Sequence, residues 1–78
     1  MSHGYTLRMC ERNRQADQRK LGVRLGALCI AKGVPVTVVS KRLGVSRATI
    51  YNWFCGTSVP QDSLRRRIEV YIAELQSA

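Results

Sequence analysis

The stretch GVSRATIYNWFCG, residues 44–56, predicts a short helix with a defined start and a defined end. A helix over about Arg47–Cys55 would begin after Ser46, whose hydroxyl can accept a hydrogen bond from the free amides of the first turn. Gly56 can end this helix, because glycine adopts the left-handed backbone of a helix C-terminus without steric cost. Gly44 would end a preceding helix in the same way. The stretch therefore predicts two short helices joined by a three-residue turn.

The residues before this turn fit the preceding helix, over about Val36–Leu43. Pro35 suits the first turn of that helix, where a missing backbone N–H is no loss. Ser40 is small enough to lie where the two helices cross. The apolar residues spaced to form a common inner face are Val39, Leu43, Ile50 and Trp53.

Two longer amphipathic segments flank this pair of helices. One runs from about Ala16 to Lys32 and ends at Gly33, and the other spans roughly Gln61 to Gln76. Gly22 and Gly26 each weaken the first segment by about 1 kcal/mol relative to alanine, unless close packing requires them. Apolar stripes at helical spacing are formed by Leu21, Leu25, Leu28 and Cys29, and by Leu64, Ile68, Tyr71, Ile72 and Leu75. The pattern predicts an all-α domain over residues 15–78.

Residues 1–14 form a polar, basic segment ahead of this domain. Tyr5, Leu7 and Met9 occupy alternate positions, which is a weak strand signal, and no second strand candidate follows. We therefore expect an N-terminal arm that is either flexible or paired as a strand with another molecule. These three apolar residues, with Val70 and Phe54, are candidates for a contact between subunits.

The charge balance points to a polyanionic partner. The chain has 78 residues, with thirteen Lys and Arg against five Asp and Glu and a net charge of +8, and its pI is about 10.3. A folded domain with this excess is expected to bind nucleic acid or, less often, an anionic membrane. No apolar run reaches transmembrane length and no signal-peptide hydrophobic region is present, so we expect no membrane association.

The residues that carry site chemistry are sparse. The three cysteines, Cys10, Cys29 and Cys55, lack CxxC spacing, and His3 is the sole histidine, so neither a disulfide framework nor a metal site is expected. Free thiols favour a cytoplasmic location. No nucleophile–base set, paired carboxylates or phosphate loop is present. We expect no enzyme activity, no cofactor and no small-molecule ligand.

The spaced residues from Val39-Ser40 through Leu43, Gly44-Val45-Ser46, Ile50, Trp53 and Gly56 to Pro60 resemble the helix-turn-helix of Cro and phage-repressor proteins. The resemblance covers about residues 34–64 and, more loosely, the first helix. Ser40 stands where that family often has alanine. Val36 stands where it often has a glutamine that touches DNA, and Thr37 can take over part of that contact.

The resemblance implies a four-to-five-helix, Cro/repressor-like domain whose recognition helix, about Arg47–Cys55, enters the major groove of double-stranded DNA. It implies base contacts from Ser46, Arg47, Ala48, Tyr51 and Asn52. It implies phosphate contacts from Thr37, Lys41, Arg42, Thr49, Thr57 and Ser58. The basic run 65–67 at the start of the last helix is as well explained by a solvated face as by phosphate contacts.

Three classes of function stay open on the sequence. The first is a small phage-type transcriptional regulator, most simply a repressor, which acts as a homodimer in the cytoplasm of a bacterium or a phage-infected host. The second is an architectural or packaging DNA binder of the excisionase or small-terminase type. The third is an antitoxin-like protein-interaction module that reuses the same fold.

Overall fold

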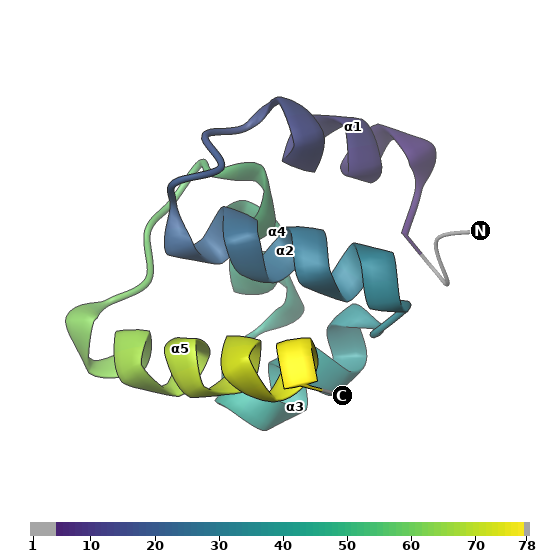
Figure 1. Ribbon diagram of the computed structural model, residues 1–78. Coiled ribbons are helices and arrows are strands. Elements are labelled where there is room, and N and C mark those ends of the chain that lie inside the picture. Colours follow the sequence, from purple (N-terminus) through teal and green to yellow (C-terminus); the bar gives the residue numbers. More distant parts are fainter. Residues whose placement is uncertain (1–4, 78) are drawn as a thin grey trace.

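The computed structural model describes residues 5–77, which form five helices and no strand (Figure 1). In chain order they are α1 (Leu7–Gln15), α2 (Leu21–Lys32), α3 (Val36–Leu43), α4 (Arg47–Cys55) and α5 (Asp62–Ser77). The expected all-α class is confirmed. The helix boundaries around the quoted stretch are also confirmed.

Helix α2 is the centre of the domain and packs against α4, α5 and α1. Its crossing with α4 is close because two glycines lie at the contact. A Cβ added at Gly22 would lie 2.7 Å from Trp53 Cβ, and one added at Gly26 would lie 2.7 Å from Phe54 Cγ. Real Cβ atoms do not approach so closely, so this crossing requires both glycines.

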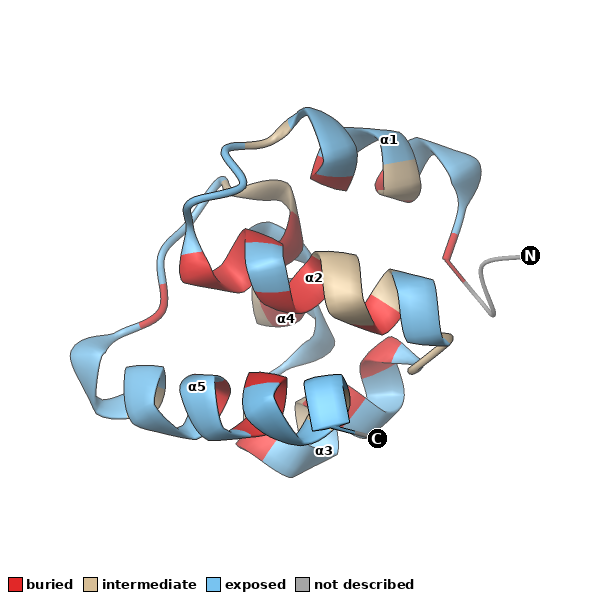
Figure 2. Cartoon of the chain, in the orientation of Figure 1, coloured by how far each residue is buried: buried red, intermediate tan, exposed pale blue. Residues whose placement is uncertain are grey.

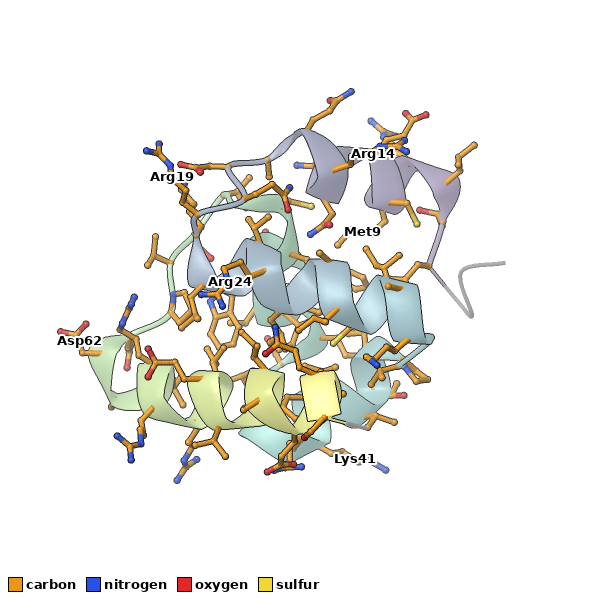
Figure 3. All side chains as sticks on the ribbon, viewed as in Figure 1. Met9, Arg14, Arg19, Arg24, Lys41 and Asp62 are labelled. Atoms are coloured by element: carbon orange, nitrogen blue, oxygen red, sulfur yellow. The ribbon has the colours of Figure 1, made fainter. Side chains whose placement is uncertain are left out.

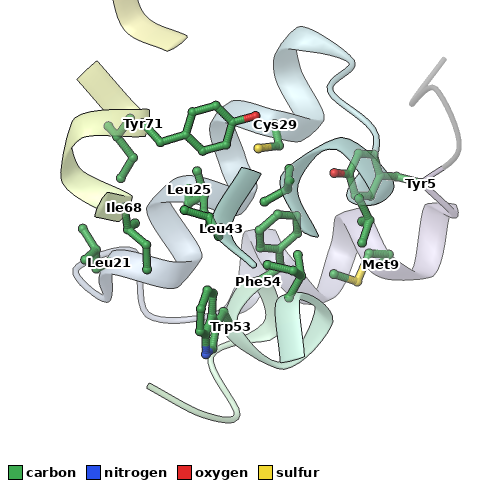
Figure 4. Packing of buried hydrophobic residues seen from close by; sticks show 14 residues of the cluster. Tyr5, Met9, Leu21, Leu25, Cys29, Leu43, Trp53, Phe54, Ile68 and Tyr71 are labelled. Carbon is green, nitrogen blue, oxygen red and sulfur yellow. The ribbon is translucent and has the colours of Figure 1, made fainter. Parts of the chain in front are cut away.

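The core fills the space enclosed by all five helices (Figure 2). Its largest fully buried side chains are Phe54, Leu25, Ile50, Ile68, Val23, Val39 and Cys29. Phe54 is central in this cluster, with Tyr5 and Met9 toward one side and Leu25 and Leu43 toward the other (Figure 4). Its complete burial shows that Phe54 is a core residue and corrects its place among the candidates for a subunit contact. Trp53 is also a core residue, as its spacing with Ile50 predicts.

From Tyr5 onward the N-terminal segment packs on the domain and forms a helix, and is not the arm that the sequence suggests; residues 1–4 of the expected arm lie outside the residues that the structure describes. Thr6 begins α1, where its hydroxyl accepts from the Met9 amide at 3.1 Å. Tyr5 and Met9 are buried against the core, whereas Leu7 is 75% exposed. The residues that face inward are therefore spaced four apart, and the alternation of the apolar residues is misleading because Leu7 points to solvent.

A buried asparagine fastens α1 to the rest of the chain. Asn13 Nδ2 donates to the carbonyl oxygens of Phe54 at 2.8 Å and Val23 at 3.2 Å. The connection to α2 is a turn, in which the Asp17 carboxylate accepts from the Arg19 amide at 2.9 Å. Because of this turn α2 begins at Leu21, later than the expected start near Ala16.

Candidate nucleic-acid interface

The turn between α3 and α4 has the geometry that its residues predict. Gly44 has a φ of 70°, in the left-handed region, and its amide donates to the Ser40 carbonyl at 2.8 Å. The Ser40 hydroxyl donates to the Val45 carbonyl and so holds the turn from the α3 side. Ser46 caps α4, with its hydroxyl accepting from the Thr49 amide at 3.2 Å. These bonds fix the angle at which α4 leaves α3.

Helix α4 is buried on one side and open on the other. Ile50, Trp53 and Phe54 face the core. The five residues named as base contacts are all exposed: Ser46, Arg47, Ala48, Tyr51 and Asn52. They occupy the first two turns of the helix and its cap. The structure thus brings the expected base-contacting residues together on one surface, which we call the α4 face.

Several polar groups at this face are already engaged locally. The Ser46 and Thr49 hydroxyls lie 2.9 Å apart and share a hydrogen bond. The Thr57 hydroxyl donates to the Asn52 carbonyl oxygen at 3.1 Å and lies 3.3 Å from Asn52 Oδ1. The amide nitrogen of Asn52 makes no hydrogen bond within residues 5–77 and remains available as a donor.

The predicted phosphate-contacting residues fall into separate groups. Thr37 and Lys41 are exposed and one turn apart on α3, so they lie on the same side of that helix. Lys41 extends from the edge of the molecule (Figure 3). Thr57 and Ser58 are exposed after the end of α4. Thr49 is partly buried beside the cap of α4.

Arg42 is directed toward α5. Its Nη2 lies 2.6 Å from both carboxylate oxygens of Glu74, and its guanidinium carbon is 4.8 Å from the ring centre of Tyr71. The hydrogen bonds to Glu74 raise the pKa of Arg42 above its already high ordinary value. Arg42 therefore ties α3 to α5 and does not share the side of α3 that carries Thr37 and Lys41.

Two arginines of α1 lie beside the α4 face, and the sequence interpretation does not include them. Arg8 and Arg12 line a pocket of about 220 Å³ together with Tyr51 of α4 and with Tyr5, Thr6 and Met9. Their spacing of four residues is the signal that could have placed them on one side of a helix. Because the sequence interpretation treats residues 1–14 as an arm and not as a helix, it draws nothing from this spacing.

The charge of the molecule is largely uncompensated. Within residues 5–77 the ion pairs are Arg19–Asp17 and Arg42–Glu74, so Arg8, Arg12, Lys41 and Arg47 have no ion-pair partner there. In the same part of the chain no three His, Cys, Asp or Glu side chains gather to hold a metal ion. None of the described helices combines the length and apolar character needed to cross a bilayer.

Among the comparisons with known proteins, the match to a protein-family model agrees with this geometry. No curated protein and no solved structure matches the chain. Residues 15–57 match the family model of the homeodomain-like domain, a helix-turn-helix family, and this match includes α2, α3 and α4. It supports the helix-turn-helix class without singling out the Cro and phage-repressor branch. The match spans more than half of the chain. The chain therefore belongs to the homeodomain-like helix-turn-helix family.

Proposed function

We propose that this protein binds double-stranded DNA sequence-specifically, with α4 as the recognition helix in the major groove. The observation that carries the proposal is the α4 face itself. Its polar and small side chains project from a helix whose other side is locked into the core by Ile50, Trp53 and Phe54. A rigid helix with an open polar face suits a groove wide enough to admit one helix.

The residues of the α4 face offer chemistry that distinguishes bases. The Arg47 guanidinium can donate two hydrogen bonds to O6 and N7 of guanine, and the Asn52 amide can pair with N6 and N7 of adenine. Ala48 presents a methyl group suited to contact with the thymine methyl. Ser46 can contribute one further hydrogen bond, and Tyr51 can reach a base or the backbone.

Residues around this face can position the helix without reading sequence. Lys41 and Thr37 lie on α3, the helix that crosses the DNA backbone in this motif. Thr49, Thr57 and Ser58 supply hydroxyl groups or backbone amides to phosphates at the two ends of α4. Arg42 would have to leave Glu74 to join them, which makes it the least available of the proposed phosphate contacts.

In biological terms we propose a small phage-type transcriptional regulator that acts as a homodimer. One recognition helix reads only a few base pairs, whereas the affinities of regulators require a larger interface. Two copies with recognition helices about 34 Å apart would read adjacent major grooves of a palindromic site. Of the apolar residues expected at a subunit contact, Tyr5, Met9 and Phe54 are buried in the core, whereas Leu7 at 75% and Val70 at 45% remain exposed.

Selection of binding sites from random duplex DNA tests this proposal. The wild-type protein should enrich one palindromic motif. Arg47→Ala should lose preference at one base pair in each half-site, by about 1–3 kcal/mol, with folding intact. Arg66→Ala removes the same charge from the exposed surface of α5 and should leave the motif unchanged. Enrichment of no motif, with broad binding and bending, would refute sequence-specific regulation and favour an architectural role.

A further inference from the structure

We propose that the pocket between α1 and α4 binds a phosphate of the DNA backbone, so that α1 is a second DNA-contacting element. This inference rests on the proposed function, because it needs α4 to be in the groove. It assigns a role to Arg8 and Arg12. It also assigns the Tyr51 hydroxyl to the backbone, while the rest of the α4 face reads bases.

The pocket lies at the surface between α1 and α4. Arg8 and Arg12 reach it from α1 and Tyr51 reaches it from α4, the helix proposed to enter the groove. A phosphate held here would belong to the strand that borders that groove. The arrangement therefore favours a backbone phosphate of the bound duplex over a free anion.

The position of α1 relative to α4 is fixed by contacts on its inner side. Asn13 donates to the Phe54 carbonyl of α4 at 2.8 Å, and the Cys55 thiol lies 3.6 Å from the Met9 sulfur. The Tyr5 hydroxyl donates to the Val34 carbonyl at 2.7 Å and holds the start of the segment. The arginines thus extend from a docked helix, and less conformational entropy is lost when they bind.

The lining of the pocket has the chemistry of a phosphate site. Two guanidinium groups offer forked N–H donors that match phosphate oxygens, and the Tyr51 hydroxyl can add a third donor. Among residues 5–77 no carboxylate lines the pocket. Neither guanidinium group has a hydrogen-bond or ion-pair partner within residues 5–77, so neither must give up a protein contact to bind the phosphate.

The test compares two double variants on the duplex selected by the wild-type protein. Arg8→Ala/Arg12→Ala should weaken binding by about tenfold or more and make the slope of log K against log salt shallower by about 0.9 for each phosphate that the variant no longer binds. Arg14→Ala/Arg66→Ala removes the same charge from exposed positions that do not line the pocket, and should change affinity much less. Thermal melting should be alike for both variants. If the Arg8→Ala/Arg12→Ala variant does not fold, Arg8→Gln/Arg12→Gln is used in its place, because glutamine keeps most of each side chain and removes the charge.

Neutral methylphosphonate linkages, placed one at a time along the half-site, locate the phosphate. A neutral linkage at one position should lower the affinity of the wild-type protein but leave the affinity of the Arg8→Ala/Arg12→Ala variant unchanged. The same linkage profile and the same salt slope for variant and wild type would overturn the inference and leave the proposed function standing. Absence of duplex binding by wild-type protein would instead refute the proposed function. Binding of inorganic phosphate at the pocket, with no dependence of duplex affinity on the two arginines, would identify a free-anion site and also overturn the inference.

Discussion

Single residues set the local geometry on which the α4 face depends. Gly44 occupies the left-handed region with φ 70°, and a Cβ added there would meet nothing within 4 Å. Its requirement for glycine is therefore conformational, not steric. Gly26 is the opposite case, because its backbone is helical and the space beside it is filled by Phe54 and Asn13.

Replacing Gly44 tests the turn directly. Gly44→Val places a β-branched residue at positive φ and should lower the free energy of unfolding by well over ~1 kcal/mol. Gly44→Asn should cost less, since asparagine tolerates this region better. Urea denaturation measures both, and an unchanged midpoint for Gly44→Val would contradict the assignment of the turn.

The buried thiol of Cys29 predicts a loss of stability at alkaline pH. Burial raises its pKa from 9.0 to about 12, and burial also raises the pKa of Tyr5 above its ordinary value of 10.0. Above pH 9 the unfolded thiol loses its proton while the folded thiol keeps it, so the stability that this thiol contributes is complete below pH 9 and falls as pH rises. The expected slope is about −1.4 kcal/mol per pH unit for each such group.

Melting temperatures measured from about pH 8 to about pH 11 check this expectation. Cys29→Ala lowers stability because it removes core packing, but it should flatten the decline that begins near pH 9. A decline that is identical in wild type and Cys29→Ala would show that another group is responsible.

At the scale of elements, α1 is what distinguishes the structure from the sequence interpretation. Helices α2 to α5 are predictable because their apolar stripes are local signals, as are the glycines that end α2, α3 and α4. Helix α1 is short and mostly polar, and what holds it is distant in sequence: Asn13 bonds to Phe54 across 41 positions. The positions of Arg8 and Arg12 beside Tyr51 follow from that docking, so the sequence could indicate the α4 face but not its extension by α1.

Asn13→Ala should therefore loosen α1 as a unit. The change leaves the Phe54 carbonyl without this donor in a buried site, which should cost about 1–3 kcal/mol. Hydrogen exchange should show faster amide exchange across α1 than in α2. Uniform destabilisation, with α1 protected as well as the core, would contradict its docking through Asn13.

At the crossing of α2 and α4, close packing predicts a change in stability for Gly26→Ala that is opposite in sign to the change predicted by helix propensity. Gly26→Ala should favour an isolated helix by about 1 kcal/mol. In the folded domain the added methyl group would lie 2.7 Å from Phe54 Cγ and 2.6 Å from Asn13 Nδ2. Overpacking of this kind typically costs about 1–3 kcal/mol, so a net loss of stability is expected in urea denaturation. A stabilised variant would show that the helices are not in close contact.

For the whole molecule, the net charge of +8 predicts strong salt dependence of DNA binding. A dimer that contacts about six phosphates should give a slope of log K against log salt near −5. Fluorescence anisotropy with a labelled duplex measures this slope, and a slope close to zero would contradict the nucleic-acid interpretation.

Light scattering on the complex should show two chains on each palindromic site, and one chain on the best site would refute the dimer.

Amide chemical-shift mapping tests most directly whether the α4 face is the surface of the protein that contacts DNA. With the selected duplex added to isotopically labelled protein, the largest shifts should fall on residues 46–52, with further shifts at Thr37, Lys41 and the α1 arginines. A second surface lies between the start of α2 and the start of α5, where Arg19, Lys20, Arg24 and Arg65 line a pocket together with Glu69 and Ser58. Its four basic residues serve as the internal comparison, because none of them is among the proposed DNA contacts. Shifts confined to that surface, with the amides of α4 unmoved, would contradict the account.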